Sequence, residues 1–392
     1  MKDMIKPTIL SLSLLTVMSG AAVAPAIAQI AAAFPEISQT AIKSILTLPA
    51  VFIIVFSLIS GKLSSIMPKR SILAGGLLFY LVGGIGGGFA NSFEFLLFSR
   101  AVLGIGVGLI MPLSMGLIAD FFDGEERAKL IGYSTATSNL GGIIATMTAG
   151  GLAVLSWRYS FGVYGLGLIV LILVLLFLPE PEVPTGASIK RQKLPGIVYV
   201  WAGGAFVLMI SFYSIPVNLA IFIQNNNLGD ASTSGLALAV LSACGFVAGL
   251  IYARVKLFLK SFLPSVLLGL LAFGYLLLSH AMSLPQVLVA TSVVGLGLGW
   301  TMPALFTGAT RAGGKGEGVQ VMAIVSSMVF LGQFLSPIVL DSIGELLGKP
   351  SARFNFTIIS FSFGTLLLAT LVHWTVTHWG KAIVRDKTKN YD

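Results

Sequence analysis

The sequence predicts an all-α membrane protein with twelve transmembrane helices, arranged as two six-helix halves that are related by pseudo-twofold symmetry. Three observations support this fold class. Hydrophobic residues make up 56% of the 392 residues, charged residues only 10%, and the mean hydropathy is +0.95, values far from those of a soluble domain. The apolar residues form long continuous runs, which in a bilayer must be helices because their backbone groups need partners within the segment. A glycine motif recurs after six spans.

The individual spans follow from the runs that lack Asp, Glu, Lys and Arg, most of which suit one helix of roughly 20 residues. The run at 261–310 holds 50 residues, and His280, Ser283 and Pro285 near its middle predict a turn between two helices. The total is then twelve. The run at 194–229 ends in polar residues and predicts one helix followed by a loop. The charge-free runs cover residues 7–35, 44–61, 71–93, 101–119, 130–157, 159–179, 194–229, 231–253, 261–310, 318–340 and 354–380.

Lysine and arginine are distributed unevenly between the two sides of the predicted bundle. With the N-terminus inside, four of the 24 (Lys43, Arg158, Lys349 and Arg353) fall outside, Arg100 lies in the membrane, and the remaining 19 fall in cytoplasmic segments. This asymmetry follows the positive-inside rule and places both termini in the cytoplasm. The net charge of +9 therefore comes from the cytoplasmic Lys and Arg residues that set the membrane topology. We expect a multi-pass protein of the bacterial cytoplasmic membrane and no nucleic-acid partner.

The first span imitates a cleavable signal peptide, since Lys2 and Lys6 precede an apolar stretch that ends in small residues. We expect it to stay in place, because its removal would leave eleven helices and break the symmetry of the halves. Cys244 is the single cysteine, which excludes an intrachain disulfide and a cysteine-rich metal site. We expect neither a metal nor another cofactor.

The two halves are marked by a motif that occurs twice, 191 positions apart. Residues 104–112 and 295–303 both read G-x-G-x-G-x-x-M-P, and the same offset carries Glu126 onto Glu317 in the following cytoplasmic loop. Because the copies are six spans apart, both halves cross the membrane in the same direction, as in parallel duplications with an axis along the membrane normal. The predicted units are the halves at 1–178 and 196–380, a cytoplasmic linker at 179–195 and a cytoplasmic tail at 381–392.

The glycines of this motif predict close helix packing. No β-strand surrounds them, which excludes a dinucleotide-binding loop, and small residues at such spacing let helix backbones approach closely. The two Met-Pro pairs are expected to mark kinks where helices flex around a central cavity. The predicted packing and gating residues of the motif are Gly104, Gly106, Gly108, Pro112, Gly295, Gly297, Gly299 and Pro303.

Three stretches resemble the major facilitator superfamily. Arg100 with the glycines that follow it resembles the family's R-x-x-x-G-x-G-x-G pattern, residues 120–129 resemble its loop between spans 4 and 5, and residues 157–161 resemble its W-R-x-x-F entry to span 6. The resemblance implies the major facilitator fold and secondary transport by alternating access. With the segment at 332–337, the chain looks most like bacterial drug and metabolite exporters driven by protons.

Two stretches depart from the family pattern. The loop between spans 2 and 3, residues 61–70, has Ser65 where the family has an aspartate of a charged latch, so gating is expected to be tuned differently. The antiporter motif of span 5 survives only as three glycines at 142, 150 and 151, and antiport is therefore implied by the resemblance alone. The gating residues implied in the two cytoplasmic loops are Gly61, Asp120 and Arg127.

Ionisable residues inside a bilayer are costly and are therefore functional candidates. Arg100 has three interpretations: a partner for an anionic substrate, a link between helices 4 and 1 during rocking, or a static hydrogen bond to a helix carbonyl. Asp341, near the outer end of span 11, is the best candidate for proton coupling. Its alternative interpretation is an interfacial residue at a helix end.

A substrate cavity between the halves is implied by the family resemblance. A few polar groups among Met, Phe and Trp suit a bulky, partly hydrophobic ligand, although the same side chains also fill helix contacts. The predicted cavity residues are Gln29, Arg100, Tyr133, Asn139, Tyr213, Asn218, Trp300 and Gln333.

The hypothesis for function is a secondary active transporter that moves a small, partly hydrophobic organic solute by proton-coupled efflux. The alternative is a facilitator or symporter for a small organic anion that uses Arg100. An integral-membrane enzyme is a remote alternative, because it would need a convergent His, Asp or Glu cluster that the sequence does not show. The expected partners are the solute, protons and the lipid bilayer, and the chain is expected to act as a monomer.

Overall fold

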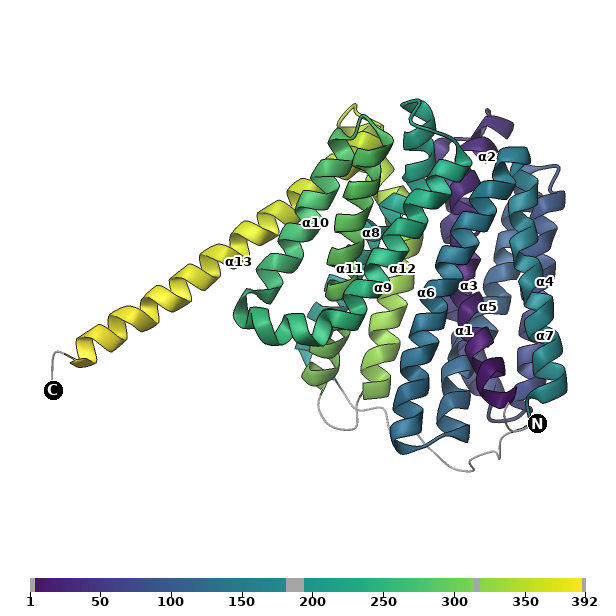
Figure 1. The fold of residues 1–392 in the computed structure, drawn as a ribbon, viewed down its shortest axis with the longest axis horizontal. Coiled ribbons are helices and arrows are strands. Elements are labelled where there is room, and N and C mark those ends of the chain that lie inside the picture. The colour runs from purple at the N-terminus through teal and green to yellow at the C-terminus, as the bar shows by residue number, and fades with distance from the viewer. Residues whose placement is uncertain (1–3, 181–193, 314–317, 390–392) are drawn as a thin grey trace.

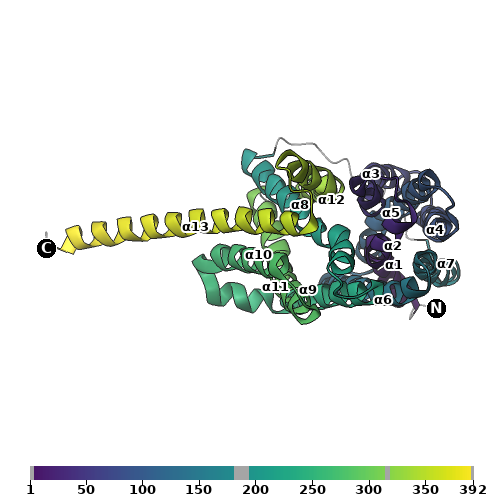
Figure 2. The ribbon, with the colours of Figure 1, turned by 90° about the horizontal axis from the view of Figure 1, so that it is seen from above.

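The computed structural model describes residues 4–180, 194–313 and 318–389, which form helices and no strand within these ranges. Figure 1 shows two groups of helices side by side, and Figure 2 shows the same groups from above. The N-terminal half contains α1 (Ile5–Ala21), η2 (Ala24–Ala26), α2 (Ile27–Ala33), α3 (Gln39–Leu63), α4 (Lys69–Gly86), η3 (Gly87–Phe89), α5 (Phe93–Phe121), α6 (Gly124–Leu155), η4 (Trp157–Gly165) and α7 (Leu166–Phe177). The C-terminal half contains α8 (Gly196–Asn225), α9 (Ala231–Leu259), η5 (Lys260–Phe262), α10 (Leu263–His280), α11 (Leu284–Gly313), α12 (Gly318–Leu346) and α13 (Ala352–Lys389).

The span count agrees with the prediction. Eleven segments of the described residues are long and apolar enough to cross a membrane, and one of them, Ala231–His280, consists of the two helices α9 and α10. The long run at 261–310 divides where predicted, since α10 ends at His280 and α11 begins at Leu284. The first span is interrupted: α1 stops at Ala21 and the helix resumes as α2, because Pro25 in η2 has no N–H for a helical hydrogen bond.

The bundle has two ends, the linker end and the far end. The linker end is where α7 ends at Phe177 and α8 begins at Gly196, and the far end is where α12 ends at Leu346 and α13 begins at Ala352. In Figure 1 the N-terminus lies at the linker end. The predicted linker at 179–195 falls mostly outside the described residues, which leave out 181–193.

The repeated glycines hold equivalent helices together in the two halves. A Cβ at Gly104 would lie 2.7 Å from the carbonyl oxygen of Pro49 on α3, and a Cβ at Gly299 would lie 2.7 Å from Cβ of Ala248 on α9. Gly106 meets the backbone of α4 in the same way. Thus α5 packs on α3 and α4, and α11 packs on α9 and α10. Residues that make these close contacts are Gly104, Gly106, Gly108, Gly295, Gly297 and Gly299.

Both prolines of the motif lie inside helices. Pro112 is within α5 and Pro303 is within α11, and each helix continues past its proline. Flexing of these helices around the prolines remains a prediction.

The two halves meet along a symmetric seam. α6 packs against α9, and α3 packs against α12. Since α3 corresponds to α9 and α6 to α12 in the repeat, the pseudo-twofold axis relates the two contacts. Gly150 on α6 and Gly235 on α9 touch at the backbone, because a Cβ on either would lie 3.1 Å from the other's Cα. Both glycines lie in the turns nearest the far end, so the halves are in close contact there.

α13 is longer than a bilayer requires. Its apolar, span-like part is Ala352–Val372, which packs against α10. The helix then continues to Lys389 and runs away from the bundle in both views (Figures 1 and 2). The predicted tail at 381–392 therefore begins inside this helix and ends outside the described residues.

Candidate functional site

A buried ion pair joins the two halves at the far end. The Lys43 ammonium on α3 lies 2.7 Å from both Oδ1 and Oδ2 of Asp341 on α12. Lys43 is 3% exposed and Asp341 8% exposed. Lys43 lies near the start of α3, at the far end, and it is buried between the halves. Its charge can be buried because it meets a carboxylate 298 positions away in the sequence, and a buried charge persists only when it is paired.

Two further donors complete the Asp341 site. Thr40, on the same face of α3 as Lys43, donates to Oδ2 at 2.9 Å, and the side-chain amide of Asn355 on α13 donates to Oδ1 at 2.9 Å. The Asp341 carboxylate therefore accepts from α3 in one half and from α13 in the other. Asp341 is enclosed by these donors, and its role in proton coupling stays a prediction.

Arg100 lies wholly inside the N-terminal half. Its Nε donates to the carbonyl of Ile45 at 3.0 Å, Nη1 to the hydroxyl of Tyr164 at 2.8 Å, and Nη2 to the carbonyl of Ser19 at 2.5 Å. The Ile45 carbonyl is available because Pro49, four residues later, has no N–H to donate to it. The guanidinium thus ties α5 to α1 and α3 through hydrogen bonds to helix carbonyls, which fits both the interpretation as a link between helices and the interpretation as a static hydrogen bond.

Three predicted cavity residues lie on the elements through which the first span packs on α8. The Tyr213 hydroxyl lies 3.4 Å from the position that a Cβ on Gly20 would take. Asn218 is 0% exposed, and its amide group donates to the carbonyl of Ser214 while its Oδ1 has no hydrogen-bond partner. Oε1 of Gln29 on α2 is likewise buried without a partner. Gln29 and Asn218 therefore each carry an uncommitted acceptor, on elements that pack against each other.

The other predicted cavity residues are dispersed. Trp300 donates its indole N–H to the carbonyl of Ala248 at 2.8 Å, which fixes α11 to α9 within one half. Gln333 is 7% exposed. Asn139, at the middle of α6, donates to the carbonyl one turn earlier at 3.0 Å. Tyr133 is 59% exposed, in a hollow of about 340 Å³ between α1 and α6 at the linker end. Trp300 and Tyr133 therefore make their contacts away from α2 and α8.

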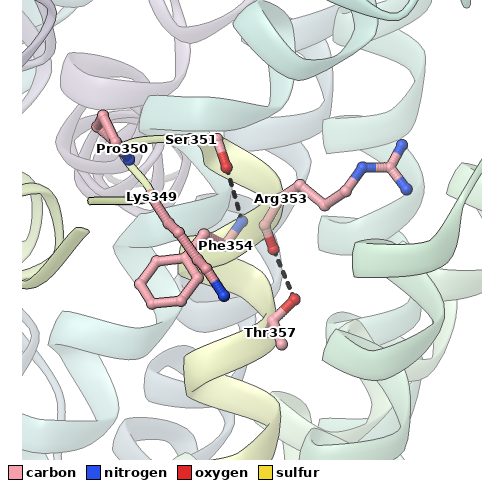
Figure 3. A pocket seen from close by; sticks show the side chains of 6 residues that line it. All are labelled: Lys349, Pro350, Ser351, Arg353, Phe354 and Thr357. Carbon is pink, nitrogen blue, oxygen red and sulfur yellow. Dashed lines mark hydrogen bonds between the residues drawn. The ribbon is translucent and has the colours of Figure 1, made fainter. Parts of the chain in front are cut away.

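A larger hollow of about 500 Å³ lies at the far end, beside the start of α13 (Figure 3). The Arg353 guanidinium points away from Lys349 and Phe354 in this view. It donates instead to the carbonyls of Ser279 and Ala281 and to the side chain of Asn226, at 2.9, 3.2 and 3.1 Å. The hollow is lined from one half only, so it is separate from the seam.

Charged residues also hold the linker end of the N-terminal half. Lys69 forms an ion pair with Asp120 at 2.7 Å. The Glu180 carboxylate accepts the backbone N–H groups of Lys69 and Arg70 at 2.6 and 3.1 Å, at the start of α4. Sequence reasoning missed Glu180, although an acidic residue beside a helix N-terminus is a recognised pairing. Ser65, at the position of the family aspartate, only donates to the carbonyl three residues earlier.

The remaining two gating residues are in open surroundings. A Cβ on Gly61 would meet no atom within 4 Å, so packing does not require glycine there. Arg127 is exposed at the start of α6. Their roles in gating remain predictions.

Comparison with known proteins identifies the family. The sequence model described as "Major Facilitator Superfamily" matches residues 9–337. The chain belongs to this superfamily. Members of this superfamily are multi-pass membrane transporters that bind small-molecule substrates.

Curated relatives of this transporter match part of the chain. A multidrug transporter protein, MdtP, from Bacillus subtilis (strain 168) is 26% identical over 191 residues, covering 48% of this chain and 34% of MdtP. The quinolone resistance protein NorA from Staphylococcus aureus is 29% identical over 140 residues, covering 36% of each chain. The chain thus spans about a third of the length of these relatives in the matches.

Solved structures match nearly the whole transporter. A bacterial homologue of the human lysosomal transporter Spinster, in an inward-facing and occupied conformation, has a TM-score of 0.77 at 17% identity and covers 94% of this chain and 97% of that chain. A D-xylose-proton symporter has a TM-score of 0.69 at 16% identity and covers 95% and 97%. These similarities establish the fold of two six-helix halves.

Proposed function

We propose that this transporter exports a small, partly hydrophobic organic solute across the bacterial cytoplasmic membrane by alternating access, driven by proton entry. Its similarity to MdtP, a multidrug transporter, and to NorA, a quinolone resistance protein, supports the efflux direction. The excess of Lys and Arg on one side supports cytoplasmic termini and therefore a cytoplasmic linker end. The transporter is proposed to act as a monomer.

The observation that carries the proton coupling is the Asp341 site at the seam. Asp341 is a buried carboxylate in one half whose cationic partner, Lys43, lies in the other half. The pair can persist only while the halves are closed at the far end, so separation of the halves changes the surroundings of a titratable group. A proton that crosses the membrane releases about 2.3 kcal/mol per 100 mV, and such a group can connect this energy to movement of the halves.

The character of the seam supports a solute that is mostly apolar with some hydrogen-bonding capacity. The side-chain oxygens of Gln29 and Asn218 lack partners among apolar neighbours, and binding sites of this kind orient ligands through a few polar groups. The anion-facilitator alternative has less support. Arg100 is 0% exposed and directs its Nε, Nη1 and Nη2 to protein acceptors.

The test uses inside-out vesicles energised by respiration, with lipophilic cationic dyes and a panel of organic anions as probes. We expect dye accumulation accompanied by proton release in the wild type, and loss of both in Asp341→Asn. Glu345→Gln is the matched control, because Glu345 is an exposed carboxylate one turn further along α12, and it should behave as wild type. Equilibration of an anion that depends on Arg100, without dye movement or proton flux, would overturn the proposal.

A further inference from the structure

We infer that Lys43 is a positioning residue that competes with the transported proton for the Asp341 carboxylate, so that formation of their ion pair closes the far end and expels the proton. This inference rests on the proton coupling proposed above. Lys43 is then the partner that determines when Asp341 binds and releases the proton. The state in which the far end is closed is the state in which Asp341 has released it.

The geometry makes the proton and Lys43 mutually exclusive. Lys43 Nζ lies 2.7 Å from both carboxylate oxygens, and each oxygen also accepts from a second donor, Asn355 at Oδ1 and Thr40 at Oδ2. A protonated carboxyl group would place an O–H where one of these donors points. Lys43 and the amide nitrogen of Asn355 can only donate here, so the hydrogen bonds as they stand belong to the ionised carboxylate.

The step balances in charge and in protons. With the far end open, Asp341 is separated from Lys43 and binds one proton from the far side, while Lys43 remains an ammonium ion. On closing, the ammonium takes the place of the proton, which leaves as hydronium toward the linker side. No other bond is made or broken. The closed pair is neutral, which suits its burial, because ionised groups persist in a low-dielectric site only when paired.

Few other charges act on this site. α8, which packs against α12, carries no charged residue, and on α11 the charged residue is Arg311 at the linker end. At the start of α13, Arg353 is held by Ser279, Ala281 and Asn226. On α12 itself, Glu345 is exposed. Lys43 is therefore the charge that contacts Asp341.

An uncommitted hydroxyl lies on the linker side of the pair. Thr47 is four residues after Lys43, on the same face of α3, and it is 0% exposed with its Oγ1 lacking a partner. Because α3 runs from the far end to the linker end, Thr47 is one turn nearer the linker end than Lys43. This hydroxyl can accept and pass on the proton that Lys43 displaces.

The test measures closure of the far end as a function of pH. Nitroxide labels on Q39C and L346C, both exposed far-end positions on α3 and α12, are placed in a Cys244→Ala background of the full-length transporter in nanodiscs. Distances between the labels are recorded from about pH 5 to about pH 9. For the transporter with Lys43 and Asp341 intact, we expect short distances at high pH and a growing long-distance population as the pH falls.

Lys43→Gln should abolish the opening at low pH, whereas Lys43→Arg should retain it because the positive charge is kept. Lys349→Gln is the matched control, since Lys349 is an exposed far-end lysine, and it should keep the full pH dependence. If Lys43→Gln does not fold, the pair K43M/D341L, which replaces the ions with apolar side chains, should hold the far end closed at every pH.

Three results would overturn the inference: label distances independent of pH with Lys43 and Asp341 intact, an unchanged pH dependence in Lys43→Gln, or a pH-dependent opening in K43M/D341L. The vesicle assay distinguishes this failure from failure of the proposed function. A pH-dependent closure that requires Lys43, without proton flux coupled to the solute, would support closure of the far end by the ion pair and would refute proton-driven export.

Discussion

The Lys43–Asp341 pair should have a large, non-additive effect on stability. The Lys43 side chain is 4% exposed and the Asp341 side chain 11% exposed, so solvent screens their interaction little. Removal of one partner from such a pair leaves an uncompensated buried charge and costs about 3–5 kcal/mol. In Lys43→Met, the carboxylate of Asp341 would keep only Thr40 and Asn355 as donors. Because about 1.4 kcal/mol corresponds to a tenfold change in an equilibrium constant, this loss lowers the population of the closed state roughly a hundredfold or more.

A double-mutant cycle tests this magnitude. Lys43→Met, Asp341→Leu and K43M/D341L are purified in detergent, and thermal unfolding is followed by tryptophan fluorescence. We expect each single variant to lower the apparent Tm by about 5 °C or more. The double variant should return close to the wild type, because replacement of a buried ion pair by apolar residues of similar volume is often neutral or stabilising.

The cycle can refute the reasoning in a simple way. If the Tm decrease of the double variant equals the sum of the two single decreases, the residues contribute independently, since additivity is the behaviour of sites that do not interact. The ion pair would then not act as a unit across the seam, and closure of the far end by this pair would have no energetic basis.

Three further predictions concern the helix contacts. Gly106→Leu should prevent stable folding, since even a Cβ there would overlap the backbone of Tyr80. Gly61→Ala is the control, because Gly61 lies in open space; its yield in size-exclusion chromatography and its Tm should be unchanged. Arg100→Gln should lower the Tm by several degrees whatever the solute, because it breaks three buried hydrogen bonds; an unchanged Tm with selective loss of anion uptake would contradict this. Asn218→Leu should change dye affinity at an unchanged Tm, because its Oδ1 has no protein partner; identical binding curves would remove Asn218 from the solute site.

The sequence predicted some features of the seam but not which residues meet across it. Gln29, Tyr213 and Asn218 were selected as polar residues on cavity-lining helices, and they lie on the elements through which the first span packs on α8. Trp300 and Tyr133 were selected by the same criterion, yet they serve a contact within one half and a hollow at the linker end. On a helix that is apolar on all sides, the residue type does not predict the direction in which a side chain points.

The sequence by itself determined the number of spans, the division into halves and the packing role of the repeated glycines. These features depend on local quantities: the length of an apolar run against the bilayer thickness, and the lack of a side chain at glycine. Only the tertiary structure decided that Lys43 is buried, that Asp341 is its partner, and that Arg100 holds the Ile45 carbonyl left free by Pro49. Charges in a low-dielectric interior are stable only through specific partners, and those partners lie up to 298 positions away in the sequence, where no local pattern indicates them.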